Sequence, residues 1–118
     1  MIAIVDDDKA VRVATERLVR SLGYHAATFG SPDEFLNSEK IHDTSCLITD
    51  LHMPGLSGID LQDLLIARGY RIPIIFITAY PDENVRIRAM KAGAIAFLSK
   101  PFNADHLLGY LERALKAA

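Results

Sequence analysis

The chain has 118 residues and a formal net charge of −2; half of its residues are hydrophobic and 24% are charged. This size and composition fit one globular domain with a single core, so neither a second domain nor a disordered chain is expected. The weak negative charge argues against direct binding of nucleic acid or of an anionic membrane by this segment.

No apolar run approaches the roughly 20 residues of a membrane span. The first six residues, MIAIVD, lack the basic flank and long apolar region of a signal peptide, so we expect a cytoplasmic location. The single cysteine, Cys46, cannot form an internal disulfide. Its apolar neighbours predict a thiol buried in a strand.

The first apolar run covers residues 2–5 and predicts a strand. A helix is predicted over residues 9–22, with Asp8 either capping it or solvated and Gly23 ending it. Its apolar stripe is predicted from helical spacing as Val11, Ala14, Leu18 and Leu22. The next run, residues 25–28, is more polar, so we expect it to form an edge strand.

Ser31 and Pro32 have the types favoured at an N-cap and a first helical turn, which predicts a short helix through residue 37. Residues 46–49 form the next apolar run and the third predicted strand. A helix over residues 58–68 follows, with Ser57 and Asp60 approximating a capping box and Gly69 closing it.

The fourth strand is predicted over residues 73–77 and the fifth over residues 94–98. Between them lies a helix over residues 82–92, closed by Gly93. The last helix begins after Asn103, and leucines at helical spacing form its apolar stripe: Leu107, Leu108, Leu111 and Leu115.

Alternating strands and helices of this kind predict an α/β fold with a parallel sheet. The first, third and fourth runs are almost continuously apolar, which is typical of central strands covered on both faces. Right-handed crossovers leave few topologies, and we expect a doubly wound (βα)5, flavodoxin-like sheet in the order 2-1-3-4-5 with helices on both faces. A ligand site is then expected beyond the carboxyl ends of strands 1 and 3.

Polar residues follow the central strands where each strand ends. Asp6 and Asp7 come after the first strand, Asp50 after the third, Thr78 after the fourth, and Lys100 shortly after the fifth. One acid in such a place is usually a cap or turn former. Because several parallel strands deliver such groups to one edge, we expect these side chains to converge.

Three neighbouring carboxylates repel one another and need a cation or shifted pKa values. Carboxylate oxygens without histidine or cysteine at metal-ligand spacing favour a hard ion, Mg²⁺ or alternatively Mn²⁺, that also accepts phosphate oxygens. A carboxylate can itself act as the nucleophile and form an aspartyl phosphate. The pattern therefore predicts a phosphoryl site.

Five segments, in order and at matching spacing, resemble the response-regulator receiver family. They are residues 4–8 (IVDDD), 49–58 (TDLHMPGLSG), 77–79 (ITA), 90–94 (MKAGA) and 100–102 (KPF). The resemblance covers nearly the whole chain. The second and fourth segments are most similar to receivers of FixJ-type regulators, which precede a DNA-binding domain.

The resemblance implies that Asp50 accepts the phosphoryl group. Asp7 would be the principal acidic metal ligand, Asp6 would support the ion through water, and the backbone carbonyl of His52 would complete the protein ligands. Lys100 would pair with Asp50 or with its phosphate. An imidazole ligand or catalytic base at His52 is the disfavoured alternative.

The resemblance further implies that the Thr78 hydroxyl binds a phosphate oxygen and that Phe97 is an aromatic switch whose rotamer follows Thr78. Phe97 as an ordinary core residue of the strand is an open alternative. The Lys100–Pro101 bond is expected to be cis, an isomer of about 5% of X-Pro bonds, which would aim the lysine into the site.

The segments Met53-Pro54-Gly55 and Ser57-Gly58 are expected to form one wall of the pocket, with the glycines in conformations closed to other residues. His52 and Tyr80 occupy positions similar to those that tune phosphate loss in the family. Tyr80 would hinder the attacking water or simply be a solvent-exposed loop residue, and both interpretations are open.

By resemblance, the chain is a single receiver domain over residues 1–118 and a signalling module, not an enzyme beyond its own phosphoryl transfer and hydrolysis. A sensor histidine kinase would be its donor. Phosphorylation would reshape the surface of the fourth helix, fifth strand and fifth helix, which would control a transcriptional output domain or a protein partner and could form a homodimer. Candidate surface residues are Val85, Arg86, Arg88, Ala89, Met90 and Lys91.

Two other functions that use similar groups fit less well. A phosphatase of the haloacid-dehalogenase type usually has an aspartate two residues after its nucleophile, where this chain has His52. A flavodoxin-like carrier needs a phosphate-cradling loop after the first strand, where Asp6, Asp7 and Asp8 would repel the phosphate. Whether the chain is an excised receiver of a longer regulator or stands alone is left open by the sequence.

Overall fold

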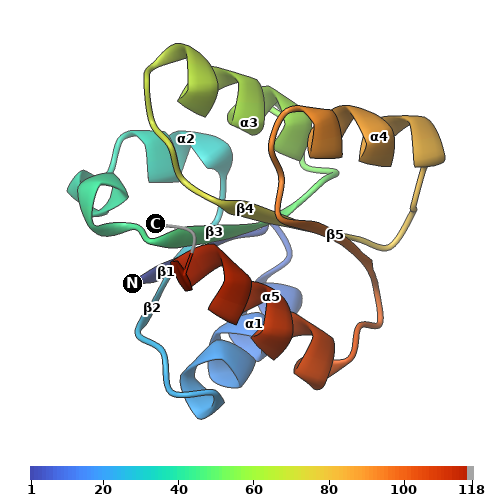
Figure 1. Ribbon diagram of the computed structural model, residues 1–118. Helices are drawn as coiled ribbons and strands as arrows, with labels where there is room; N and C mark the ends of the chain where they lie inside the picture. Colours follow the sequence, from blue (N-terminus) through green and yellow to red (C-terminus); the bar gives the residue numbers. More distant parts are fainter. Residues whose placement is uncertain (117–118) are drawn as a thin grey trace.

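Five parallel strands form the centre of the molecule (Figure 1). The computed structural model describes residues 1–116. The strands are β1 (Ile2–Val5), β2 (Ala26–Phe29), β3 (Cys46–Asp50), β4 (Ile74–Thr78) and β5 (Ala96–Ser99). They pair in the order β2-β1-β3-β4-β5, and every pair is parallel. The predicted topology is confirmed, including the edge position of β2.

Helices cover both faces of the sheet. They are α1 (Lys9–Ser21), α2 (Pro32–Leu36), α3 (Gly58–Ala67), α4 (Glu83–Lys91) and α5 (Ala104–Lys116), with a short 3-10 helix, η1 (Glu39–Asp43), before β3. In Figure 1, α2, α3 and α4 lie on one side of the sheet and α1 and α5 on the other. Within residues 1–116, no helix combines the length and the apolar character that crossing a bilayer requires.

The central strands are buried along their whole length because each contributes to two cores. Alternate side chains of β1, β3 and β4 point to opposite faces. Ala3, Leu47 and Phe76 pack with α2, α3 and α4, whereas Ile4 and Ile48 pack with α1 and α5. This two-sided burial explains why these strands are continuously apolar in the sequence.

The predicted helix ends are confirmed by their hydrogen bonds. Asp8 caps α1 by accepting from the backbone amides of residues 10 and 11. Ser57 and Asp60 form a reciprocal capping box at the start of α3. Gly23, Gly69 and Gly93, which follow α1, α3 and α4, all have positive φ angles, which glycine adopts without steric cost.

The buried face of α1 differs from the predicted stripe. Thr15 and Val19 are the fully buried residues of this helix, whereas Ala14 is exposed. Thr15 tolerates burial because its hydroxyl donates to the backbone carbonyl of Val11 at 2.8 Å. The prediction is confirmed for Leu18 and Leu22, which pack against the core, and was wrong for Ala14. Spacing of apolar residues alone could not reveal the internally bonded threonine.

Cys46 lies at the start of β3 and is completely buried, as predicted. Burial disfavours its thiolate and raises the pKa of the thiol to about 12. Cys46 is therefore an unreactive core residue at neutral pH.

Candidate functional site

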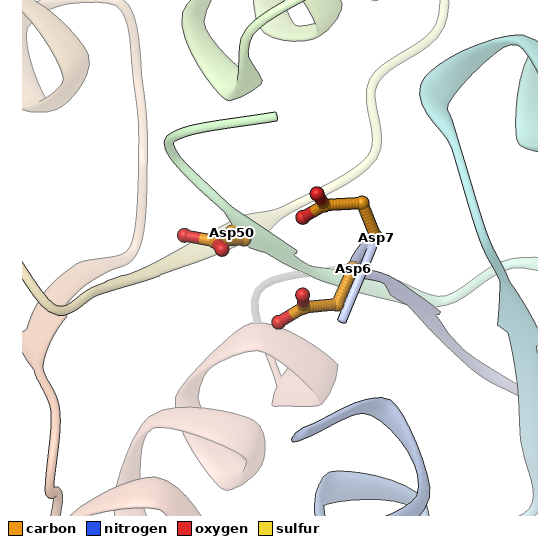
Figure 2. A group of neighbouring side chains, drawn as sticks. All are labelled: Asp6, Asp7 and Asp50. Carbon is orange, nitrogen blue, oxygen red and sulfur yellow. The ribbon is translucent and has the colours of Figure 1, made fainter. Parts of the chain in front are cut away.

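Three carboxylates gather at the carboxyl edge of the sheet, as the sequence predicts. Asp6 and Asp7 follow β1, and Asp50 is the last residue of the neighbouring strand β3. One carboxylate oxygen from each lies within 4.8 Å of the others (Figure 2). Asp6 and Asp50 are buried, with 1% and 8% exposure, whereas Asp7 is exposed.

Lys100 reaches this cluster from the end of β5. Its Nζ lies 3.5 Å from Asp50 Oδ2 and 3.6 Å from Asp6 Oδ2. Its backbone amide donates to the carbonyl of Thr78 at 2.7 Å, which ties the end of β5 to that of β4. The Lys100–Pro101 bond is cis, as predicted. The cluster of three acids thus has one ammonium group, which pairs with Asp6 and Asp50, and this imbalance of charge favours binding of a further cation.

The pKa of Asp6 is shifted by its burial and by the charges around it. Burial raises its pKa, and the charges of Asp50 and Asp7 act in the same direction, while the Asp8 amide and Lys100 oppose them. The Asp8 amide donates to Asp6 Oδ1 at 2.9 Å. Asp6 Oδ2 is buried without a hydrogen bond, because Lys100 at 3.6 Å is close enough for an ion pair only.

Thr78 lies at the end of β4, one residue beyond the partner of Asp50 in the sheet register. It is completely buried, and its hydroxyl oxygen accepts from the Tyr80 amide at 3.0 Å. That contact uses the oxygen as an acceptor and leaves the hydroxyl proton for another partner. The edge of the sheet therefore combines acids, an amine and a hydroxyl, as predicted.

His52 and Tyr80 flank the cluster from two loops. The His52 amide points to Asp50 Oδ1 at 3.4 Å, and the His52 and Tyr80 rings meet edge to face with centroids 6.0 Å apart. Tyr80 is 75% exposed, which agrees with a solvent-exposed loop residue. The pairing of the two rings is a feature that their sequence positions do not show.

Gly58, the first residue of α3, packs directly against Asp50. A Cβ atom here would lie 2.6 Å from the Asp50 carbonyl oxygen and 3.1 Å from the Phe76 ring. Gly55 has a φ of +79°, so the prediction of a special glycine conformation holds there. At Gly58 it was wrong, because the requirement is for space and not for a left-handed backbone.

Phe97 lies on β5 beside Phe76 of β4, with ring centroids 6.2 Å apart. Its side chain is half-buried against the core beneath α3 and α4. This position agrees with a core role, and the switch role of Phe97 stays a prediction.

The sequence did not indicate the role of Arg12 at the site or the burial of Ala89 in α4. The Arg12 Nη1 atom donates to the Asp6 backbone carbonyl at 2.7 Å and holds the end of β1, although an arginine in a helix carries no signal for this role. Ala89, expected on the output surface, is completely buried and faces α3. That expectation was wrong because the neighbouring charged residues made the whole helix look exposed.

The comparisons with known proteins agree on one family. Residues 2–112 match the model of the response regulator receiver domain. The chain is 47% identical to the response regulator protein TmoT of Ectopseudomonas mendocina, over 100% of the chain and 54% of that protein. It is 35% identical to the transcriptional regulatory protein FixJ of Bradyrhizobium diazoefficiens, over 99% of the chain and 57% of that protein.

Solved structures give the same answer for the fold. The response regulator StyR superposes with a TM-score of 0.90 at 45% identity, covering 98% of this chain and 59% of that one. FixJ-N superposes with a TM-score of 0.88 at 34% identity, covering 99% and 94%. The chain spans about half the length of the curated relatives it matches.

Proposed function

The chain belongs to the response regulator receiver family of two-component systems, and from this premise we propose that it is a signalling switch that accepts a phosphoryl group on Asp50. The donor would be a phosphohistidine of a sensor histidine kinase. The observation that carries the proposal is the convergence of Asp6, Asp7 and Lys100 on the Asp50 carboxylate.

Asp50 is the best placed of the three acids to be the nucleophile. Asp6 is almost completely buried and already accepts a hydrogen bond from the Asp8 amide. The Asp50 side chain keeps 11% exposure and lies within reach of both Lys100 and the His52 amide. An incoming phosphorus atom can therefore approach Asp50 while charged and polar donors surround it.

In the proposed step, an Asp50 carboxylate oxygen attacks the phosphorus and forms an acyl phosphate. The phosphorus–nitrogen bond of the donor breaks, and its electron pair leaves with the imidazole. Lys100 would neutralise charge on the transferred group, and the Thr78 hydroxyl would donate to one of its oxygens. This is the chain's own phosphoryl transfer and later hydrolysis, not turnover of a separate substrate.

The acidic cluster fits a divalent cation of the hard type. Its donors are all oxygens, and Asp6 Oδ2 is a buried acceptor that lacks a hydrogen bond. We assign Asp6, Asp7, Asp50 and the His52 backbone carbonyl as the groups that would hold Mg²⁺, with Mn²⁺ as a substitute. When bound, the ion would offset the repulsion among the acids and the charge of the phosphoryl group.

The output follows from the position of Thr78. A phosphate that attracts Thr78 would shift the following loop, turn Phe97 inward and alter the surface of α4, β5 and α5. TmoT and FixJ are described as a response regulator and a transcriptional regulator, and this chain spans about half of each. We therefore propose that residues 1–118 are the receiver unit of a cytoplasmic transcriptional regulator, with phosphorylation favouring a homodimer.

The proposal is tested by incubating the protein with acetyl phosphate and Mg²⁺ and measuring its intact mass. One phosphoryl group should appear on the wild type, and Asp50→Asn should gain none. Asp63→Asn, which removes an exposed carboxylate on α3, is the matched control and should be labelled like the wild type. Labelling of Asp50→Asn, or no labelling of the wild type, would overturn the assignment.

A further inference from the structure

Helix α4 is embedded less deeply than its neighbour on the same face of the sheet. Ala89 is the only buried residue among the nine of α4, whereas α3 buries five of its ten. Figure 1 shows the two helices side by side. With so little apolar burial, the position of α4 depends on its few specific contacts.

The main specific contact is a buried hydrogen bond from Gln62 of α3. The Gln62 Nε2 atom donates to the Ala89 backbone carbonyl at 3.1 Å, and the glutamine side chain is 2% exposed. Because a carbonyl can only accept, this bond fixes which end of the amide faces α4. Gln62 Oε1 is buried without a hydrogen-bond partner. The bond from Nε2 to Ala89 therefore forms although the oxygen of the same amide is unsatisfied.

The Ala94 amide donates to the same Ala89 carbonyl at 3.1 Å, but that bond belongs to the turn that ends α4 and does not link the helix to α3. A pocket of about 530 Å³ lies beside Gln62 and the C-terminal part of α3, and it is lined also by residues 69–74 and by Ala92, Gly93 and Ile95, which follow α4, so the end of α4 does not pack tightly on α3 there. Arg88 and Asp63 form an ion pair at 2.9 Å, but both side chains are more than half exposed. Exposed pairs of this kind contribute little.

The first half of α4 is held differently. Its one packing residue is Val85, which is partly buried against the core, whereas Glu83, Asn84 and Arg86 are exposed and Asp82 caps the helix from the loop side. Only residues 79–82 separate this end from Thr78. The helix thus has one end joined to the proposed phosphate-binding residue and the other end tied to α3.

We propose that Gln62 anchors the C-terminal half of α4, so that the part of the response to phosphorylation that reaches α4 is confined to its first half. The anchor itself concerns the unphosphorylated protein, and its consequence for signalling rests on the function proposed above. Gln62 acts as a positioning residue through α4 and touches none of the reacting groups.

The anchor is tested first without any ligand, by amide hydrogen exchange of the full chain. Gln62→Met keeps the side-chain length and removes both the donor and the unpaired oxygen, so overall stability should change little. Exchange of residues 88–94 should become about tenfold faster, as expected when one hydrogen bond that governs local opening is lost. Exchange in α1 should stay as in the wild type.

Asp63→Asn removes the exposed ion pair with Arg88 and is the matched control. Its hydrogen exchange in α4 should stay within about twofold of the wild type. Gln62→Leu is the second variant in case the methionine packs poorly. Unchanged exchange of residues 88–94 in both Gln62 variants, or an equal increase in α1 and α4, would overturn the anchor.

The signalling consequence is tested with beryllofluoride and Mg²⁺, a stable substitute for the phosphoryl group. Between residues 78 and 94, changes in exchange in the wild type should stop within residues 78–87, and in Gln62→Met they should extend through residues 88–94. Changes of equal extent in both proteins would refute the confinement. No change in either protein would count against the proposed function, while the ligand-free result would still decide the anchor.

Discussion

The middle of the sheet and its carboxyl edge are built from the same three strands, β1, β3 and β4, yet the two regions have opposite energetics. In the middle, side chains such as Ile4, Ile48 and Phe76 are apolar and almost completely buried. Two residues further along, Asp6, Asp50 and Thr78 are also buried but polar. The change from apolar to polar side chains occurs within two residues along each strand.

The difference separates stability from function. Burying the apolar residues stabilises the fold in proportion to the area removed from water. Burying Asp6 beside other acids opposes folding, as the raised pKa of its carboxyl shows. The fold therefore tolerates unfavourable burial of charge at the edge of the sheet. Substitutions in the middle and at the edge should change the free energy of unfolding in opposite directions.

The largest effect is expected in the middle of β4. Phe76→Ala should reduce the free energy of unfolding by about 3–5 kcal/mol, because it removes a fully buried ring and leaves a cavity. Urea denaturation followed by circular dichroism measures the loss. Ile66→Ala, on the exposed face of α3, should change stability by less than about 0.5 kcal/mol. Similar losses for both variants would show that the middle does not dominate stability.

The next effect lies where the edge meets α3. Gly58→Ala should cost about 1–3 kcal/mol and slow labelling of Asp50, because the added Cβ would collide with the Asp50 carbonyl and the Phe76 ring. Gly109→Ala, in α5, has open space around it and should instead stabilise the protein by up to about 1 kcal/mol. If Gly58→Ala were as stable and as quickly labelled as the wild type, the close packing would not matter.

A substitution at the edge itself should have the opposite sign. Without Mg²⁺, Asp6→Asn should stabilise the protein by roughly 0.5–2 kcal/mol, because it removes a buried charge from among acids. The folded protein binds the Asp6 proton more tightly than the unfolded chain does. Stability from this group is therefore greatest at low pH and is lost as pH rises through the folded pKa.

Denaturation of wild type and Asp6→Asn at several pH values tests this sign. The advantage of the variant should grow as pH rises, whereas Asp7→Asn, at an exposed position, should show a smaller gain. A destabilised Asp6→Asn protein at neutral pH would mean that Lys100 more than compensates the buried charge.

The smallest effect is expected at the cap of α3, where Asp60 is exposed to solvent. Hydrogen bonds from Ser57 lower the pKa of Asp60, so this group contributes stability above its unfolded pKa and loses it as pH falls through the folded pKa. Asp60→Asn should remove this part of the acid sensitivity, with Asp33→Asn in α2 as control. An unchanged pH profile in an Asp60→Asn denaturation series would exclude the contribution.

The sequence predicts the middle of the sheet well and the edge only in part. Buried parallel strands must be continuously apolar, so residues 2–5 and 46–49 were located directly, and parallel order brings Asp6 and Asp50 together. Contacts between helices depend on packing that no local pattern records. The structure was needed to show three such features: the burial of Thr15 and Ala89, the close packing at Gly58, and η1 with its single buried residue.

The most direct test of the account is to locate the phosphoryl group on the chain. After treatment with acetyl phosphate and Mg²⁺, borohydride reduction converts an aspartyl phosphate to homoserine, which peptide mass spectrometry can assign to one residue. Homoserine is expected at position 50 and at no other aspartate. Homoserine at position 6 or 7 with an unmodified Asp50 would contradict it.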